Sequence, residues 1–598
     1  MGQQHPEISD ADEELEVLLQ PGTSLREKEL FVSKLRRQLD YSVFALSIFA
    51  VIIGLLAAYG SAGFRLAFGT IQTWIQNASW TVGYSFLAGP LGKMVLLAAG
   101  GLIFGIILAA LRWERFRTPA HVIVAAQEGG GRLRWWDGLV TAGADALSLG
   151  LGASVGRYGP AIQLGATVGS AVGQWLKLGR TSIRILLGCG VAASISAAFN
   201  APIAGVIFAH EVIIGHFRFR AFVPVTLSSV AAVAITRAHH FEYVAMKLFD
   251  AQQTLSLVDY PIYIGIGLGG AAIALAYMHG ITNLGWLARK AYLPIWLQPM
   301  IGGVIAGSVA FLIPEVLGLG DEIIQNILEQ DIDRPRYGAW MLLALIGAKL
   351  IASIACLGLR FPGGAFTPAI FVGAAYGGLL GLLIPGIDYQ IAVLVGMGAL
   401  MSSVVGAPLA MVLVVFELTE NYQATTAVMV GVVAANAVVT RLFGRSLFHR
   451  QIRRWGIDLD RPQEQRRLSQ MPVTELMGSS YHFVRPHRTV AEIRKIISRS
   501  YRGEVYIVDE TQRLLGVISM SLLAKADPDE QAHDICSPIT ASLLQTDSVW
   551  KGFNQIDGMT GETVPVIDNP EDRQLIGVIH LTEFVGAYRK AVREVRED

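Results

Sequence analysis

Apolar segments fill most of the chain from about residue 41 to residue 443, and polar sequence precedes and follows them. Many of these segments are shorter than the roughly 20 residues that a straight helix needs to cross a bilayer. They include residues 43–66, 94–111, 183–198, 262–276, 300–313, 341–358, 391–404 and 427–439. Backbone that breaks at membrane depth must be buried in protein or line a polar cavity. The pattern therefore predicts a polytopic all-α membrane protein with tilted or half-crossing helices.

The membrane region contains one sequence pattern twice, at an offset of 208 residues. Residues 156–169 read GRYGPAIQLGATVG, and residues 364–377 read GAFTPAIFVGAAYG. A second pair follows, with APIAGV at 201–206 before Glu211 and APLAMV at 407–412 before Glu417. Each half thus opens an apolar helix with a glycine-and-proline break, and breaks in corresponding places of two halves indicate the substrate site of a membrane transport protein. We expect repeat halves at about residues 41–255 and 256–450.

Beyond Trp455 the composition becomes that of a soluble protein, and another repeat appears. The run EVYIVD at 504–509 matches TVPVID at 563–568, and each is followed by a Gly-Val-Ile strand. A helix is expected before each pair of strands, the second capped by Thr546 or Asp547. We predict an N-terminal cytosolic segment, the membrane domain, a linker and two α/β units, at residues 1–40, 41–450, 451–469, 470–530 and 531–598.

Composition agrees with a membrane protein. Of the 598 residues 52% are apolar and 16% are charged, whereas about a quarter of the residues in a typical soluble protein are charged. The mean hydropathy is +0.46. Residues 1–40 are polar, so no signal peptide is expected. Basic residues flank the apolar region at Arg26, Lys28, Lys34, Arg36 and Arg37 and again at Arg441, Arg445, Arg450, Arg453 and Arg454. Because positive flanks stay in the cytoplasm, both termini are expected there.

Catalytic signatures are missing from the sequence. It contains no nucleophile–base pair, no cluster of metal ligands and no phosphate-binding loop of the Walker type. The formal net charge of zero averages unlike parts of the chain, so it gives no information about partners. A nucleic-acid partner is not expected. An enzyme is therefore not expected, and neither is a metal site or a required cofactor.

Five motifs in one order resemble the CLC chloride channel and transporter family. They are GRYGP at 156–160, NAPIAG at 200–205, GGAFTP at 363–368, GMG at 396–398 and FELTENY at 416–422. The two α/β units resemble a pair of CBS domains, which often follows the membrane part in this family. The resemblance implies inverted repeats and a homodimer in which each subunit has its own pathway for chloride or another small inorganic anion.

The resemblance also implies two anion sites. Backbone amides around Gly156, Arg157, Tyr158 and Gly159 would form the outer site, and those of Ala365, Phe366 and Thr367 the central one. The physics agrees, since a helix start has free N–H groups and about half a positive charge. Such partial charges hold an anion without binding it too tightly for conduction. The alternative reading of these glycines is tight helix crossing.

Four positions depart from the family pattern. Family exchangers carry a gating, proton-carrying glutamate where this chain has Tyr158, and a phenol with a pKa near 10 stays neutral at pH 7. The second proton-route glutamate falls on Val212. Its neighbour Glu211 is interpreted as a structural acid, with a His210–Glu211 proton relay as the alternative. The pore tyrosine is replaced by Phe448, and the pore serine falls near Thr118.

Loss of both proton carriers predicts passive anion transport, by a channel or an uncoupled uniporter gated at Tyr158, with chloride as the expected anion. The first alternative is a proton-coupled antiporter that uses relocated acids such as Glu211, His210 or Asp145. The second is a CBS-regulated cation transporter. The few ionisable groups in the inferred spans include Arg157 and Lys349, and this mixture does not favour a cation.

CBS pairs often bind adenine nucleotides, and an acid four residues after the Gly-Val-Ile strand commonly contacts the ribose. Here those positions are Leu522 and Glu583, so one acid is lost and the other is kept as glutamate. Regulation by an adenine nucleotide at Glu583 is one hypothesis. A dimerisation and stability module is the other.

Overall fold

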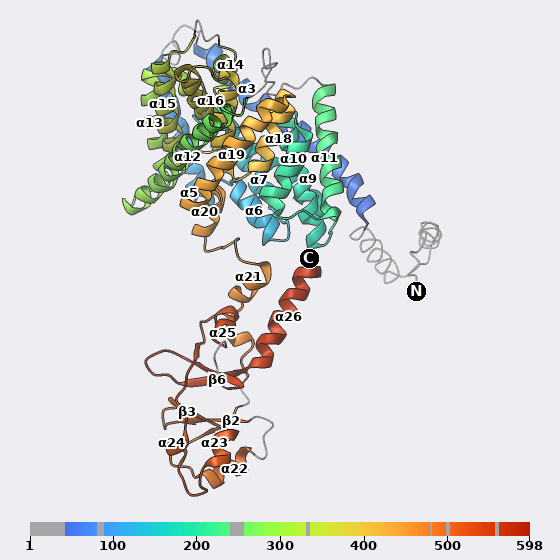
Figure 1. Ribbon diagram of the computed structural model, residues 1–598. Coiled ribbons are helices and arrows are strands. Elements are labelled where there is room, and N and C mark those ends of the chain that lie inside the picture. The colour runs from blue at the N-terminus through green and yellow to red at the C-terminus, as the bar shows by residue number, and fades with distance from the viewer. Residues whose placement is uncertain are drawn as a thin grey trace, which may run out of the picture. The chain divides into compact units, whose positions relative to one another are not determined.

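The computed structural model describes residues 42–79, 89–239, 256–330, 335–478, 481–497, 503–556 and 561–597. The chain divides between Trp455 and Gly456 into two compact units, a helical unit and an α/β unit (Figure 1). The N-terminal segment 1–40 and its basic residues lie outside the described residues. The predicted cytoplasmic position of both termini and the predicted domain boundaries stay predictions.

The first half of the helical unit begins with a long helix and continues with shorter ones. Its elements are α3 (Val43–Ser79), α5 (Pro90–Leu111), α6 (Pro119–Gln127), α7 (Trp135–Gly150), α8 (Tyr158–Trp175), α9 (Arg180–Phe199), α10 (Pro202–Phe208), the π-helix η1 (Ala209–Ile214) and α11 (Phe219–Ala238). Both α6 and α10 begin with proline, whose fixed φ and missing N–H suit the first turn of a helix.

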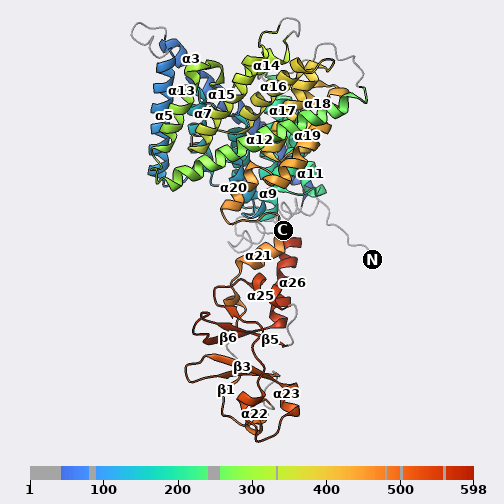
Figure 2. The same cartoon turned by 60° about the vertical axis from the view of Figure 1, so that its left-hand side comes forward.

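The second half repeats this order. Its elements are α12 (Asp259–Lys290), α13 (Gln298–Leu312), the 3-10 helix η2 (Pro314–Val316), α14 (Asp321–Leu328), α15 (Ala339–Gly358), α16 (Phe366–Leu383), α17 (Tyr389–Val405), α18 (Pro408–Thr419), α19 (Tyr422–Leu442) and α20 (Leu447–Arg454). The long helix α12 lies obliquely to its neighbours in both views (Figures 1 and 2).

Equivalent helices pack in equivalent ways. In the first half α8 packs on α9, and α3 packs on α9 and α11; in the second, α16 packs on α17, and α12 packs on α17 and α19. Glycines allow the closest of these crossings. A Cβ on Gly165 would lie 2.1 Å from the Gly190 oxygen, and one on Gly377 would lie 2.3 Å from the Ala392 oxygen. Tight crossing is therefore the role of these helix-interior glycines.

Eight helices in the described part of the chain are long and apolar enough to span a membrane. Others are too short to cross. With a rise of about 1.5 Å per residue, the 9-residue α6 reaches less than half of a hydrocarbon core of about 30 Å. The predicted class, a polytopic helical protein with half-crossing helices, is confirmed.

The second unit contains two similar sheets, each with one parallel and one antiparallel pairing. The sheets run β1-β2-β3 and β4-β5-β6. The first repeat comprises β1 (Phe483–Val484), α22 (Val490–Ile497), β2 (Glu504–Val508), β3 (Leu514–Ser519), α23 (Met520–Lys525) and α24 (Ala532–Ile535). The second comprises β4 (Leu543–Leu544), α25 (Val549–Gln555), β5 (Thr563–Ile567), β6 (Leu575–His580) and α26 (Leu581–Glu597), and α21 (Gln463–Gln470) and the 3-10 helix η3 (Val473–Glu475) precede both repeats.

The predicted cap of α25 is wrong by one or two residues. Ser548, rather than Thr546 or Asp547, caps this helix, and its Oγ accepts from the Lys551 N–H at 3.3 Å. Asp547 instead accepts from the Leu544 N–H at 3.0 Å and pairs with Lys551 at 2.8 Å. Its carboxylate therefore closes the turn before the helix.

Candidate anion-binding site

The glycine-and-proline breaks of the two halves meet directly. Gly156 and Gly364 exchange two backbone hydrogen bonds, of 2.7 and 2.9 Å, and form an antiparallel bridge. A Cβ on Gly156 would lie 2.7 Å from the Thr367 hydroxyl, and one on Gly364 would lie 3.0 Å from the Gly159 nitrogen. Only glycine fits at both positions. The antiparallel sense means that the two breaks run in opposite directions where they touch, as inverted repeats require.

Free backbone N–H groups collect where α8 and α16 begin. Gly156 and Gly364 bond to each other, and the Arg157 N–H donates to the Thr367 hydroxyl at 3.3 Å. Five others have no acceptor among the described residues, namely those of Tyr158, Gly159, Ala365, Phe366 and Thr367. Buried donors of this kind need a partner. Two helix dipoles direct positive partial charge to the same place, so an anion is the partner that fits.

Two further helix starts lie beside α16 and enclose a small inner cavity. Thr118 precedes α6, and Phe448 lies in the first turn of α20. Both line a cavity of about 40 Å³ together with Gly363, Gly364 and Ala365. The Thr118 hydroxyl lies 3.4 Å from the Gln451 Oε1 and 3.3 Å from the His121 Nδ1. The structure thus brings Thr118 and Phe448 to the start of α16, as the sequence alignment placed them.

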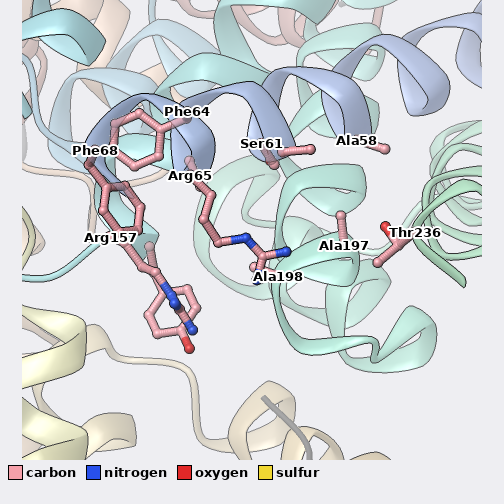
Figure 3. Close-up of a pocket in the computed structure, with 12 residues that line it drawn as sticks. Ala58, Ser61, Phe64, Arg65, Phe68, Arg157, Ala197, Ala198 and Thr236 are labelled. Atoms are coloured by element: carbon pink, nitrogen blue, oxygen red, sulfur yellow. The ribbon is translucent and has the colours of Figure 1, made fainter. Parts of the chain in front are cut away.

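A second small cavity of about 40 Å³, the outer cavity, lies among α3, α8, α9 and α11 (Figure 3). Its lining includes Tyr158, Arg157 and Arg65, and Figure 3 shows the Arg65 side chain extending from α3 toward Ala198. The Arg157 guanidinium pairs with Asp321 at 2.9 Å and lies 5.4 Å from the centre of the Tyr158 ring. Arg65 was not among the predicted site residues, although a charged side chain inside the apolar run of α3 is the signal that identifies it.

Aromatic rings separate the two cavities. Tyr158, which is 2% exposed and lines the outer cavity, stacks on Phe199 with a centroid distance of 4.2 Å and an angle of 18°. The Phe366 ring lies 6.3 Å from Tyr158 and 5.9 Å from Phe448, which lines the inner cavity. Phe208 packs on Phe366 at 6.0 Å. The ring contacts therefore connect Tyr158, at the outer cavity, through Phe366 to Phe448, at the inner cavity.

Glu211 and Glu417 hold equivalent positions and make equivalent bonds in the opposite halves. The two Glu211 oxygens accept from the N–H groups of Leu409 and Ala410, at 3.1 and 2.9 Å, in the first turn of α18. The two Glu417 oxygens accept from Ile203 and Ala204, at 2.9 and 2.7 Å, in the first turn of α10. Each carboxylate thus caps a helix of the other half.

The remaining predicted proton carriers are dispersed. His210 is buried, its Nδ1 lies 2.9 Å from the His216 carbonyl, and its ring stacks on Phe217. Asp145, in α7, is 2% exposed and makes no hydrogen bond or ion pair with any described residue. The buried Lys349 donates to the Val316 and Gly318 carbonyls, at 2.9 and 2.8 Å, so its role in the described structure is to close the turn after η2. None of these groups lines either small cavity.

Comparisons with known proteins agree with this geometry. Residues 100–440 match the family model for the voltage gated chloride channel. The chain is 30% identical over 421 residues to a ClcB-like chloride channel protein of Ralstonia nicotianae, across 68% of this chain and 96% of the relative. This chain belongs to the CLC family. It is therefore a multi-pass membrane protein for anion transport and not an enzyme.

Other CLC relatives give the same picture. The chain is 30% identical over 423 residues to the voltage-gated ClC-type chloride channel ClcB of Escherichia coli, across 68% of this chain and 97% of the relative. Its fold is similar to that of a slow cyanobacterial Cl−/H+ antiporter, with a TM-score of 0.59, 23% identity and coverage of 70% and 99% of the two chains. The fold is also similar to that of a eukaryotic CLC transporter, with a TM-score of 0.58 and 18% identity. This match covers 92% of this chain and 98% of the transporter chain.

A CBS model matches residues 473–529, and the second repeat has the same strand order. CBS domains can bind adenine nucleotides. Glu583 is exposed in the first turn of α26, directly after β6, and Leu522 lies in α23. A cleft between the repeats is lined by Tyr481, His482, Glu504, Thr563 and His580, among others. The Glu504 carboxylate accepts from the Glu562 and Thr563 N–H groups, at 2.9 and 3.1 Å, and so joins the two repeats.

Proposed function

We propose that this CLC protein conducts chloride passively, as a channel or an uncoupled uniporter, through a pathway that passes Tyr158. The observation that carries the proposal is the lining of the two small cavities. The lining includes five arginines and residues at four helix starts, and five free N–H groups lie nearby, but none of the described lining residues is an aspartate or glutamate. Proton transfer near neutral pH needs a group that titrates there, and a buried phenol does not.

The proposed outer site consists of the N–H groups of Tyr158 and Gly159, and the proposed central site consists of those of Ala365, Phe366 and Thr367. Gly156 and Arg157 support the outer site, because their own N–H groups fix the relative position of α8 and α16. Thr118 supplies a hydroxyl at the inner cavity. Phe448 supplies an aromatic edge there, whose positive rim is compatible with an anion.

Tyr158 is the proposed gate. Its ring is buried between the two cavities and is held by the stack on Phe199 and by the Arg157 guanidinium. An anion that moves from the outer to the inner cavity must pass this ring and then Phe366. Rotation of the Tyr158 side chain alone would open the first of these barriers without movement of a whole helix.

The test is the reversal potential of proteoliposomes that contain the full chain. Under a chloride gradient alone, and again with an added pH gradient, the potential should follow chloride and stay unchanged by pH. A shift of the potential with pH would overturn the passive mechanism. Absence of any chloride current, together with a current for another small anion, would overturn the choice of chloride but not the pathway.

The second candidate is a proton-coupled antiporter, and Asp145 is the observation that favours it. A carboxyl that is 2% exposed and has no partner among the described residues is costly unless it is protonated or functional. If the reversal potential shifts with pH, Asp145→Asn should abolish the shift. Glu211→Gln should not, because both Glu211 oxygens already hold α18.

A homodimer in which each subunit has its own pathway is also proposed. Large apolar side chains are exposed on the helices around the reciprocal caps, including Ile203, Phe219, Val230, Leu409 and Val433. Apolar faces of this kind suit a second copy as well as lipid. Single-molecule mass measurement in lipid nanodiscs should give two chains per particle, and one chain per particle would contradict the proposal.

We propose further that an adenine nucleotide binds the CBS pair, with the Glu583 carboxylate on the ribose, and modulates transport. The exposed carboxylate directly after β6, and the Tyr481 ring and His482 at the cleft, support this. Titration of adenosine monophosphate into the full chain should show saturable binding that Glu583→Gln weakens at least tenfold. No binding by the parent chain would favour the dimerisation and stability module.

A further inference from the structure

A cavity of about 740 Å³ lies next to the small inner cavity. The two cavities share lining residues, among them Arg115, Arg360 and Gln451. The larger one is bounded by the loop between α5 and α6, the end of α12, the loop before α16, and α20. It is lined by six arginines, which are Arg112, Arg115, Arg117, Arg289, Arg360 and Arg454.

Most of this positive charge is not neutralised within the described structure. Among the described residues, Arg117 alone of these six has a carboxylate partner, Asp137 at 2.7 Å. Arg360 and Arg454 donate to the carbonyls of Glu114 and Thr282, which carry no net charge. Glu114 is the only acid in the lining, and it makes no ion pair with a described residue. Five guanidinium groups therefore face one carboxylate.

The arginines also act on one another. Burial, together with the positive charges of Arg360, Arg289 and Arg454, lowers the pKa of Arg115 to about 10. Arg115 stays protonated at neutral pH, so burial and the neighbouring positive charges lower its pKa without removing its charge. Like charges at this density are destabilising unless an anion offsets them.

The size of the cavity indicates what kind of anion. Pockets of about 300 to 1,000 Å³ hold molecules of ligand size, so a cavity of about 740 Å³ is far larger than one halide needs. Guanidinium groups bind phosphate oxygens in a bidentate way and do so with high geometric specificity. Three tryptophans, Trp113, Trp286 and Trp455, also line the cavity and add aromatic surface beside the guanidinium groups.

We propose that this arginine cavity binds a polyanion with two or more phosphate charges, either a soluble polyphosphate or the phosphorylated headgroup of a lipid. Because it shares Arg115, Arg360 and Gln451 with the inner cavity, a bound polyanion occupies the inner mouth of the pathway and reduces anion flux. The reduction of flux rests on the proposed passive pathway, whereas the binding itself does not.

The binding test uses inorganic tripolyphosphate titrated calorimetrically into the full chain in neutral detergent at low salt. Saturable binding that weakens steeply with added salt is expected. Arg115→Gln combined with Arg289→Gln should weaken it at least tenfold, and Arg289→Gln alone at least threefold. Arg289 is exposed at the end of α12 and has no partner among the described residues, so this single variant keeps the test valid if the double variant does not fold.

Arg132→Gln is the matched control. It removes the same charge from an exposed arginine of the same unit that does not line this cavity, and its binding should equal that of the parent. No saturable binding by the parent, or equal losses in Arg132→Gln and Arg289→Gln, would overturn the proposal.

Two further arms identify the source of the phosphate and separate this proposal from the passive mechanism. Nanodiscs with a phosphorylated inositol lipid should abolish tripolyphosphate binding if the ligand is a headgroup, and should leave it unchanged if the ligand is soluble. In proteoliposomes, tripolyphosphate on one side should reduce chloride flux in the parent but not in Arg289→Gln. Binding without reduced flux would overturn the location at the mouth of the pathway, while a pH-dependent reversal potential would overturn passive transport and leave the binding result intact.

Discussion

Replacement of Tyr158 by alanine should raise anion flux. The phenol is held by a parallel stack on Phe199 at 4.2 Å. Such aromatic pairs contribute about 0.5–1.5 kcal/mol beyond area burial. If the stack is what holds the ring in the pathway, its loss should increase the fraction of open pathways about two- to twelvefold, since 1.4 kcal/mol corresponds to a factor of ten. Tyr158→Ala removes the ring as well as the stack, so the anion flux of this variant should increase by more than about twelvefold.

Phe199→Leu separates the two effects, because it removes the stacking partner and keeps the tyrosine. Phe208→Leu is the matched control, since Phe208 packs on Phe366 and not on Tyr158. The assay is chloride efflux from proteoliposomes at equal protein density. Phe199→Leu should be about two- to twelvefold faster than the parent, and Phe208→Leu should be closer to it. A Tyr158→Ala variant slower than the parent would refute the reasoning and make the tyrosine an anion ligand rather than a plug.

Three further outcomes are expected. Glu417→Gln should destabilise the membrane unit by about 1–3 kcal/mol, because a charged cap is lost from the start of α10. A lowered midpoint of thermal unfolding would show this. Glu420→Gln, at an exposed acid three residues further on, should not lower that midpoint. Tyr158→Glu should make the reversal potential depend on pH, whereas Tyr158→Gln should leave it independent of pH. Thr563→Val should lower the unfolding temperature of the CBS unit, because it removes the Thr563 hydroxyl that bonds both the Glu504 carboxylate and the Tyr506 hydroxyl. Thr546→Val, at an exposed threonine, should have no effect.

The repeats and the helix breaks could be predicted from the sequence because identical residues recur at a fixed offset of 208 positions. Pro160 and Pro368 lie in the first turns of α8 and α16, where a missing N–H costs no helix hydrogen bond. Gly156 and Gly364 lie where a side chain would clash. The family follows from these motifs, and so does the position of Phe448 at the inner cavity.

Contacts made between distant segments were not predictable. Glu211 and Glu417 were recognised as equivalent, but that each caps a helix of the opposite half depends on how the halves are placed. The arginine cavity gathers side chains from four separate segments, which no local pattern connects. The cap of α25 was misplaced for a different reason, since Thr546, Asp547 and Ser548 are all good capping residues and only the path of the preceding turn decides among them.

The exchange of Glu211 and Glu417 bears on how such a protein could arise. Each half carries a helix start that is completed only by a carboxylate of the other half, and each break glycine bonds only to its counterpart. A half-length ancestor would have had these groups unsatisfied as a monomer. Two copies inserted in opposite orientations would have satisfied them all. Fusion of two such genes would have fixed a contact that the separate copies already made, and would have left each half free to diverge on its own side of the shared pathway.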